Sequence, residues 1–241
     1  PQVGAVAGRI DVLNRGHNLL TRMLGVRYRI GFDFVRAYQS VLGSVFVCPG
    51  AFTAYRMSVI SSHFEAWRHQ TFLGAPCTNG DDHALTNVVL SNGFEARYQS
   101  NAVARTNVPT TYKRLCMMYL RWSRSNVRES TRYIGFVPKL ARNMRWWPAI
   151  LDAVVSWVQI PMRIYLLFLG WGALLFFPGL LVRTISVALT LSIVHAIIYL
   201  RSERSLDAAY TVLYSVFSLL TLQWIYPAAL LTVRKSRWMT R

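Results

Sequence analysis

The sequence predicts an α/β domain followed by α-helical interfacial and transmembrane segments. Residues 1–132 alternate strand-like and helix-like patterns, which is typical of an α/β domain. Residues 133–161 mix aromatic and basic side chains and indicate amphipathic helices at a membrane interface. Residues 162–233 contain long uncharged apolar runs, which favour a membrane region of two or three segments. A basic tail over residues 234–241 completes this predicted organisation.

The composition excludes several classes of protein. The chain has 241 residues, with 27 Lys+Arg against 10 Asp+Glu, a formal net charge of +17 and 53% hydrophobic residues. So much apolar surface excludes a disordered chain. Three widely spaced cysteines without metal-ligand spacing exclude a disulfide-rich scaffold. The basic excess suits the phosphates of a nucleotide or of anionic lipid, and its position beside apolar runs argues against nucleic acid as the partner.

The α/β region opens with a predicted strand. Residues 3–13 are apolar and β-branched, as strands are. Apolar positions at helical spacing predict a helix over 18–41, or two helices broken near Gly31. Residues 44–48 then predict a short buried strand.

The pattern of a helix between strands continues in the second part of this region. Residues 79–82 predict a turn that opens a helix with two acids in its first turn, where the helix dipole favours them. Residues 91–93 end that helix with a glycine. Residues 94–105 predict one long strand or a pair of strands, and 109–131 a further helix.

A basic stretch separates the α/β region from the apolar region. From Arg97 to Arg145 there are 11 Lys+Arg and a single acid, Glu129, interleaved with aromatic residues. One interpretation is a solvated basic face. The other is an interfacial stretch beside a membrane, because arginine and aromatic side chains both favour the headgroup zone.

Three uncharged runs follow the basic stretch, at residues 164–182, 184–200 and 208–233. The first has 19 residues, and as a helix it spans about 28 Å, close to the thickness of the hydrocarbon core. We expect crossings by residues 162–182 and 184–200. Residues 208–233 carry scattered polar residues and a proline, and we expect them to lie along the interface or to re-enter the membrane.

Charge predicts the orientation. Arg201, Arg204 and the basic tail favour the cytoplasmic side. An extra crossing by residues 147–162 is the alternative that also brings the tail to that side. Either topology predicts a multi-pass protein of the inner or plasma membrane with its α/β domain in the cytoplasm.

Only ten acids exist, and Asp81 and Asp82, directly after Gly80, are the one adjacent pair. Two carboxylates this close raise the pKa of one of them and can create a general base. The alternative interpretation is a helix N-cap, which a single aspartate would satisfy. Spacing alone leaves both open.

Four segments, taken in order, resemble the processive family 2 glycosyltransferases, and in particular the branch of hyaluronan synthases, chitin synthases and nodulation chitooligosaccharide synthases. The segments are residues 48–56, 80–87, 119–125 and 236–241. The resemblance covers nearly the whole chain. It implies a GT-A-like catalytic domain, only partly contained in this chain, on the cytoplasmic face of a membrane.

The resemblance assigns a membrane-bound transfer of a sugar from a UDP-sugar donor to a growing polysaccharide. The second acid of the family's motif takes the proton of the acceptor hydroxyl, which maps to Asp82, with Asp81 as a supporting acid. The branch implies N-acetylglucosamine as the sugar. A lipid bilayer is the third expected partner, beside the donor and the acceptor, and no nucleic acid is expected.

Further site residues follow from the same resemblance. Arg121 would neutralise the leaving diphosphate and Trp122 would stack on the acceptor sugar. The acceptor-side segment contributes Gly50, Tyr55 and Arg56. The tail resembles a gating segment, of which the matched residues are Trp238 and Arg241.

The sequence departs from the family pattern at three positions. Met118 stands where the family has glutamine, Met239 replaces a glycine, and His83 occupies a position usually held by arginine. We do not expect His83 to be a metal ligand.

The family also implies a divalent cation, Mg²⁺ or Mn²⁺. Its Asp-x-Asp metal motif does not occur in this chain, and we expect it upstream, so no metal ligand is assigned here. The chain opens directly with a strand-like run at Pro1, and we expect it to be a fragment that is inactive alone. The competing hypothesis from another class is a non-catalytic membrane scaffold or transport subunit with a basic cytoplasmic domain.

Overall fold

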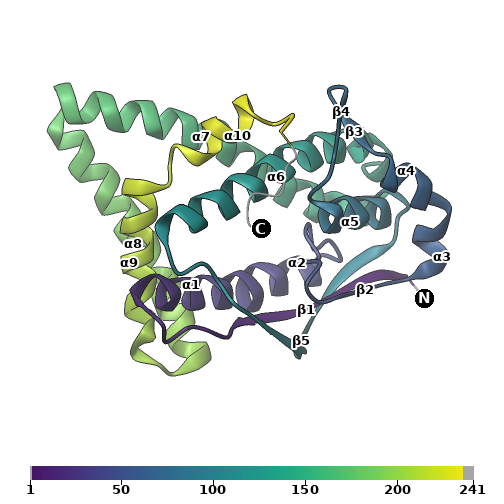
Figure 1. Ribbon diagram of the computed structural model, residues 1–241, viewed down its shortest axis with the longest axis horizontal. Coiled ribbons are helices and arrows are strands. Elements are labelled where there is room, and N and C mark those ends of the chain that lie inside the picture. The colour runs from purple at the N-terminus through teal and green to yellow at the C-terminus, as the bar shows by residue number, and fades with distance from the viewer. Residues whose placement is uncertain (1, 236–241) are drawn as a thin grey trace.

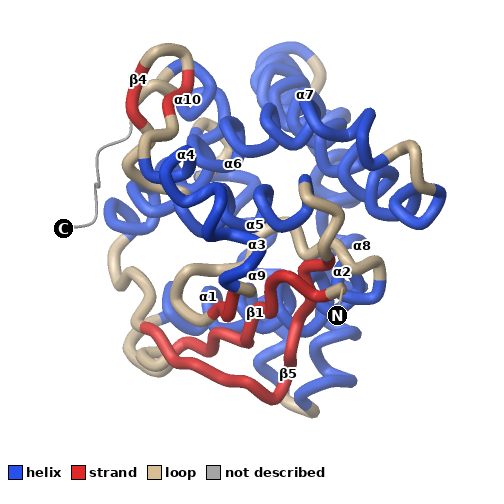
Figure 2. Tube along the Cα trace, turned by 90° about the vertical axis from the view of Figure 1, so that its right-hand side faces the viewer, coloured by secondary structure: helices blue, strands red, loops and turns tan. Residues whose placement is uncertain are grey.

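A small mixed sheet forms one side of the molecule (Figures 1 and 2). The computed structural model describes residues 2–235, with the backbone alone at 159–160, 163, 166, 170–171, 173–175, 178 and 180–181. The central strand β1 (Val3–Val12) pairs in parallel with β5 (Glu95–Thr106) and antiparallel with β2 (Thr53–Tyr55). The β1–β5 register shifts between Gly8 and Arg9. This sheet supports the helices that carry the candidate site.

Helices gather over the sheet and extend away from it. After β1 come α1 (Leu19–Ile30), a π-helical segment η1 (Gly31–Arg36), α2 (Ala37–Val41), α3 (Met57–Ile60) and α4 (Phe64–Arg68). A two-stranded hairpin, β3 (Thr71–Phe72) and β4 (Ala75–Pro76), precedes α5 (Asp81–Ser91). The long helices follow: α6 (Tyr112–Leu140), α7 (Trp147–Phe176), α8 (Pro178–Glu203), α9 (Ala209–Thr221) and α10 (Ile225–Leu231). Short 3₁₀ turns lie at Ser61–His63, Met144–Trp146 and Leu206–Ala208.

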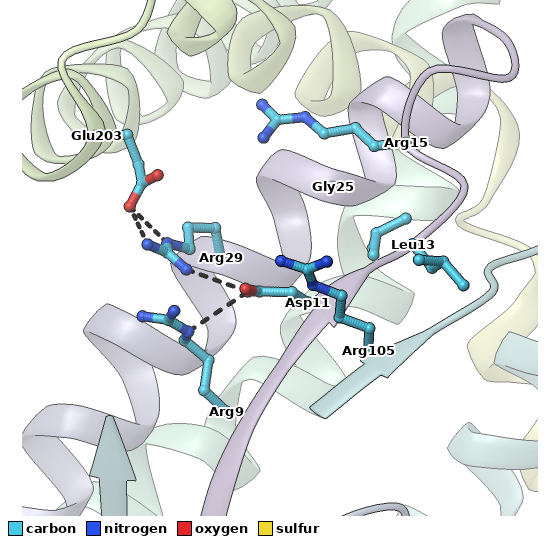
Figure 3. A pocket seen from close by; sticks show the side chains of 9 residues that line it. Arg9, Asp11, Leu13, Arg15, Gly25, Arg29, Arg105 and Glu203 are labelled. Carbon is cyan, nitrogen blue, oxygen red and sulfur yellow. Dashed lines mark hydrogen bonds and ion pairs between the residues drawn. The ribbon is translucent and has the colours of Figure 1, made fainter. Parts of the chain in front are cut away.

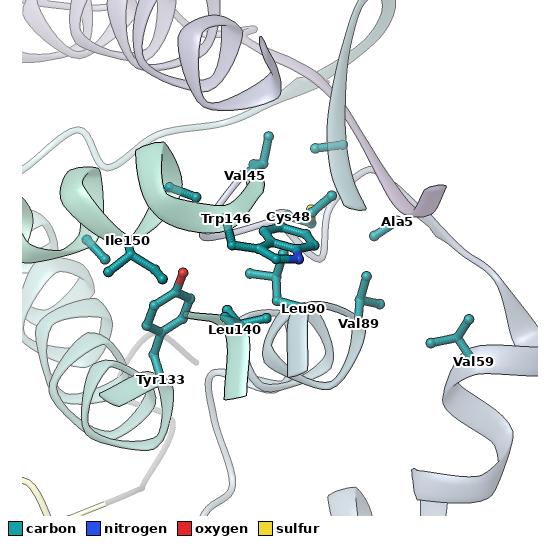
Figure 4. Packing of buried hydrophobic residues seen from close by; sticks show 14 of the residues in the cluster. Ala5, Val45, Cys48, Val59, Val89, Leu90, Tyr133, Leu140, Trp146 and Ile150 are labelled. Atoms are coloured by element: carbon teal, nitrogen blue, oxygen red, sulfur yellow. The ribbon is translucent and has the colours of Figure 1, made fainter. Parts of the chain in front are cut away.

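Two apolar clusters join these elements. In the first, Ala5 of β1, Leu90 of α5, Tyr133 of α6 and Ile150 of α7 pack around Trp146 (Figure 4). The second joins α1, α6 and α10 through buried Leu24, Leu115, Met118 and Ile225, among others. The helices that follow the α/β region therefore share its core, because burial of these side chains stabilises both parts at once.

Several predicted elements are confirmed. The strand predicted over 3–13 is β1, and residues 94–105 form one long strand, β5. The helix predicted to open at 79–82 is α5. Residues 19–41 form one continuous helical run, in which the expected break near Gly31 is a change to π-helical hydrogen bonding.

The predicted strand at 44–48 is wrong. Only Ser44 forms a bridge, parallel to Ala96. The chain then leaves the sheet, because the backbone amide of Cys48 donates to Thr86 Oγ1 (3.1 Å) of α5 instead of to a strand.

The first predicted crossing, 162–182, is not a single helix, because α7 ends at Phe176 and α8 begins at Pro178. Proline has no amide hydrogen to continue α7, and it suits the first position of α8. Helix α6 extends to Leu140, so the boundary predicted between residues 132 and 133 falls inside it.

Within the described residues, one helical stretch, Val182–Glu203, is long and apolar enough to cross a membrane. A second candidate is the pair Leu206–Thr221 and Ile225–Leu231, which bend by 49° at their break. Such a bend suits a broken span or a re-entrant segment. Re-entry is one of the two placements expected for residues 208–233, beside a position along the interface.

Candidate active site

The adjacent aspartates lie at the N-terminus of α5, where a left-handed glycine begins the helix. Gly80 has φ 85°. A Cβ at this position would collide with the hydroxyl of Ser125 on α6 and would lie 2.8 Å from Ser125 Cβ. The position requires glycine for its backbone angle and for the close approach of α6. The turn therefore sets where Asp81 and Asp82 project.

Backbone amides hold the carboxylate of Asp82. Its Oδ1 accepts from the amide of His83 (2.9 Å), and its Oδ2 accepts from the amide of Gly50 (3.0 Å). The structure therefore brings two of the predicted site residues, Gly50 and Asp82, into direct contact. The carboxylate is half-buried and fixed from two sides.

Tyr55 supports the same turn from β2. Its hydroxyl donates to the backbone carbonyl oxygens of Asp82 (3.1 Å) and Cys48 (3.3 Å). Burial raises the pKa of Tyr55, so the hydroxyl keeps its proton for these carbonyls.

The sequence analysis missed Thr86, which is fully buried. Its hydroxyl donates to Asp82 O (2.8 Å) and accepts from the Cys48 amide (3.1 Å). The available signal was its position four residues after Asp82, one helical turn along α5.

Asp81 is exposed at the same helix end. Partial burial raises its pKa, the neighbouring Asp82 raises it further, and the cation of Arg128 opposes both. The indole of Trp67 donates to the backbone carbonyl of Asp81 (3.2 Å). The two acids therefore differ in surroundings: Asp82 is bound by two amides, and Asp81 faces solvent.

Arg121 of α6 lies near this helix end, and Trp122 follows it in the helix. Burial lowers the pKa of Arg121, and the carboxylate of Asp82 opposes that shift, so the guanidinium lies in the field of Asp82. Trp122 is exposed, with its ring 5.6 Å from Tyr119 and 6.4 Å from Tyr28 between centroids. A cation thus lies near the fixed carboxylate, and the exposed ring of Trp122 lies beside Tyr28.

Two further arginines belong to this region, and the sequence analysis did not find them. Arg27 Nη1 and Arg36 Nη1 lie 3.5 and 3.8 Å from the position of a Cβ on Gly31, so the two cations are neighbours. Arg36 stacks on Phe32 at 4.5 Å. Burial lowers the pKa of Arg36, while Asp82 is among the groups that raise it. Neighbours on an α-helix are three or four residues apart, whereas these arginines are nine apart. The π-helical segment between them was not predictable from the sequence.

Burial raises the pKa of Tyr28 to about 12, although three cations, those of Arg36, Arg27 and Arg121, oppose this shift. Tyr28 is therefore the neutral centre of an arginine cluster. Such a cluster is suited to an anionic group, because arginine forms charge-assisted hydrogen bonds with phosphate and carboxylate oxygens.

The remaining predicted residues do not join Asp82. Arg56 is exposed and donates from Nε to Val3 O (2.8 Å), so it binds the beginning of the central strand β1. Trp238 and Arg241 lie outside the described residues.

A separate polar pocket of about 300 Å³ lies between the sheet, α1 and the end of α8 (Figure 3). Arg29 occupies its wall and pairs with Asp11 (3.1 Å) and, through Nε, with Glu203 (2.6 Å). These carboxylates largely neutralise the charge of Arg29, and the residue joins α8 to the sheet.

The described residues do not fit the divalent cation that the family resemblance implies. Among residues 2–235, no cluster of three His, Cys, Asp or Glu side chains can hold a metal ion. Both oxygens of Asp82 already accept from amides. No step described below passes through a metal.

No family model matches the sequence. Known proteins do. The chain is 31% identical over 247 residues to Hyaluronan synthase 3 of Xenopus laevis and to that of Homo sapiens, which covers 100% of this chain and 42% of each relative. It is 33% identical over 245 residues to Hyaluronan synthase of Streptococcus pyogenes, which covers 99% of this chain and 56% of the relative. The chain spans about half the length of the curated relatives it matches. The resemblance expected from the sequence is confirmed.

Proposed function

We propose, on the premise that this chain is hyaluronan synthase-like along its whole length, that it is part of a membrane-bound glycosyltransferase. The reaction is the transfer of a sugar from a UDP-sugar to a growing polysaccharide. The observation that carries the proposal is the carboxylate of Asp82, which is held by the amides of Gly50 and His83 near the guanidinium of Arg121.

Asp82 acts as the general base. An acceptor hydroxyl attacks the anomeric carbon of the donor sugar, its proton passes to the Asp82 carboxylate, and the bond from that carbon to the diphosphate breaks. The two amides orient the carboxylate before the acceptor arrives, so little reorganisation is needed in the transition state. Asp81 supports this base from the preceding position.

Cations stabilise the leaving group. Arg121 faces the diphosphate, and the neighbouring Arg27 and Arg36 add positive charge to the same region. The developing negative charge on UDP is stabilised by fixed guanidinium groups. Trp122 offers its exposed ring to the apolar face of the acceptor sugar.

Other parts of the proposal rest on the resemblance and on the sequence. They are N-acetylglucosamine as the sugar, a multi-pass location in the cell membrane, and a cytoplasmic catalytic domain. Gly50 and Tyr55 serve the acceptor side through the Asp82 turn, Arg56 lines the segment before α3, and Trp238 and Arg241 form a gating segment. A divalent cation, Mg²⁺ or Mn²⁺, is bound outside this chain.

Asp82→Asn tests the assignment in the full-length protein. The amide keeps the size of the side chain and removes its basicity, so we expect UDP release to fall by about 10²–10⁴-fold. Asp81→Asn is the matched control, and its rate of UDP release should fall far less. Membrane insertion, the chromatographic profile and UDP-sugar binding should stay unchanged for both.

Transfer by Asp82→Asn at the wild-type rate would overturn the base assignment. Loss of transfer in Asp81→Asn alone would move the base to that residue. An absence of any UDP-sugar turnover by the wild-type, full-length protein with a panel of UDP-sugars would instead support the scaffold hypothesis.

A further inference from the structure

A buried arginine joins the turn that carries the two aspartates to the C-terminal segment of the chain. Arg128 of α6 is 1% exposed. Its Nη2 donates to Asn79 O (2.8 Å) and to Asn79 Oδ1, and its Nη1 donates to Val233 O (3.3 Å). One guanidinium therefore contacts segments far apart in the sequence.

No carboxylate of the described residues forms a salt bridge with this cation, and its hydrogen-bond acceptors there are amide and carbonyl oxygens. Glu129 and Asp81 act on it only at longer range. A buried cation without a paired anion is costly, because its desolvation is only partly offset. Such a group is difficult to explain as a contribution to stability alone.

The turn that Arg128 holds is the one that aims the base. Asn79 directly precedes Gly80, whose left-handed backbone begins α5. Ser125, one helical turn before Arg128, packs against Gly80 from the same face of α6. A displacement of Asn79 therefore moves Asp81 and Asp82.

A second contact ties α6 to the C-terminal segment. Arg124 Nε donates to Thr232 Oγ1 (2.9 Å), next to the carbonyl that Arg128 binds. Arg128 binds both the Asn79 turn and this segment.

We propose that Arg128 is a positioning residue for the base, which makes the placement of Asp82 depend on where the C-terminal segment at Val233 lies. This inference rests on the proposed function. The segment docks on α6 through Arg124 and Arg128, and the Asn79 turn is then held in the geometry that aims the carboxylate.

The charge of Arg128 also acts on Asp81. Asp82 of α5 and burial raise the pKa of Asp81, and Arg128 of α6 lowers it. Cys77, Glu129, Arg132 and Arg124 are the other titratable or charged groups around Arg128. Removal of the cation should therefore raise the pKa of Asp81 further.

The experiment compares Arg128→Gln, Arg128→Lys and Arg124→Gln in the full-length protein, with the exposed Arg114→Gln of the same helix as control. Arg128→Gln should lower kcat about tenfold or more, with KM for the UDP-sugar changed less than about twofold. Arg128→Lys should also lower kcat, but less than Arg128→Gln, because it retains the charge and loses the two-sided fork.

Arg124→Gln should lower kcat less, and Arg114→Gln should behave as wild type. Wild-type kcat in both Arg128 variants would overturn the inference. Equal losses of kcat in Arg124→Gln and Arg128→Gln would do so too, since that pattern means general loosening. If Arg128→Gln does not fold, as judged by size-exclusion chromatography, the lysine variant carries the test.

These results are distinguishable from failure of the proposed function. If Asp82→Asn retains full transfer, the base assignment fails whatever the Arg128 variants do. If Asp82→Asn abolishes transfer and the Arg128 variants are unaffected, the inference about positioning alone fails.

Discussion

Gly80 is the residue at which backbone angle and packing coincide. A side chain there must adopt φ 85° and displace Ser125. We expect Gly80→Ala to lower the free energy of unfolding by more than about 1–2 kcal/mol, the cost of the left-handed angle alone. The unfolding midpoint in detergent and the rate of UDP release would both fall.

A double-mutant cycle with Ser125→Gly identifies the contribution of packing. Removal of the Ser125 side chain relieves the collision but not the strained angle. The double variant should therefore recover part of the loss relative to Gly80→Ala. Strict additivity of the two single variants would contradict the proposed collision.

His83 predicts a pH dependence of stability. It is 6% exposed, and burial lowers its pKa from 6.5 to about 4. Between these values the unfolded chain binds a proton that the folded chain does not, so acidification favours unfolding. The free energy of unfolding should fall by up to roughly 1.4 kcal/mol per pH unit from about pH 6.5 towards pH 4 because of this residue.

His83→Gln removes that contribution. Denaturation curves at pH 7, 6 and 5 give the free energy of unfolding of the variant and of the wild type. The difference between the two removes the contribution of the carboxylates, which both proteins share. Parallel pH profiles would show that His83 does not titrate as its burial implies.

Sequence reasoning found Asp82 because acids are scarce and because the neighbouring motif resembles a known family. It did not find Thr86, Arg27 or Arg36. Thr86 bonds a backbone amide that lies 38 positions earlier, and the two arginines meet only because a π-helical segment separates them. Such contacts depend on tertiary packing, which periodicity does not encode.

At the scale of elements, Arg29 joins four of them. Its guanidinium, on α1, pairs with Asp11 of β1, Asp33 of η1 and Glu203 of α8. Arg29→Met would leave three carboxylates facing one another, so we expect a loss of about 1–3 kcal/mol.

Glu203→Gln is the matched comparison, since it removes one partly exposed partner and should cost less than about 1 kcal/mol. Unfolding midpoints of the two variants at low and high salt provide the measurement. A larger loss in Glu203→Gln than in Arg29→Met would contradict the central role of the cation.

Most elements were predictable where one pattern extended over a long run, as for β1, α5 and β5. The strand at 44–48 failed because the side chain of Thr86 competes for the Cys48 amide. The predicted boundary near Arg183 failed because hydropathy continues through Pro178, which ends one helix and begins the next.

At the scale of the whole molecule, contacts predict which segments share one side of a membrane. Val233 should lie on the same side of the membrane as the sheet, because Arg128 joins it to the Asn79 turn. Helix α4 should lie there too, because its Trp67 donates to the carbonyl of Asp81. Glu203 at the end of α8 is joined to the sheet as well. The turn at Phe177, at the other end of α8, should therefore lie across the membrane.

Single cysteines at Arg68, Lys235 and Phe177, in a background with the three native cysteines replaced by serine, test this arrangement. In sealed vesicles, a membrane-impermeant maleimide should label Arg68→Cys and Lys235→Cys from one side and Phe177→Cys from the other. Labelling of all three from the same side would exclude α8 as a crossing.

The contact of Arg128 with Val233 has a consequence for biosynthesis. The two residues are 105 positions apart, whereas Arg128 and Asn79 are 49 apart. A ribosome delivers the aspartates and α6 well before residue 233 emerges. On the proposed function, the nascent chain therefore cannot fix the Asn79 turn through this contact until the helices that precede Val233 have been made.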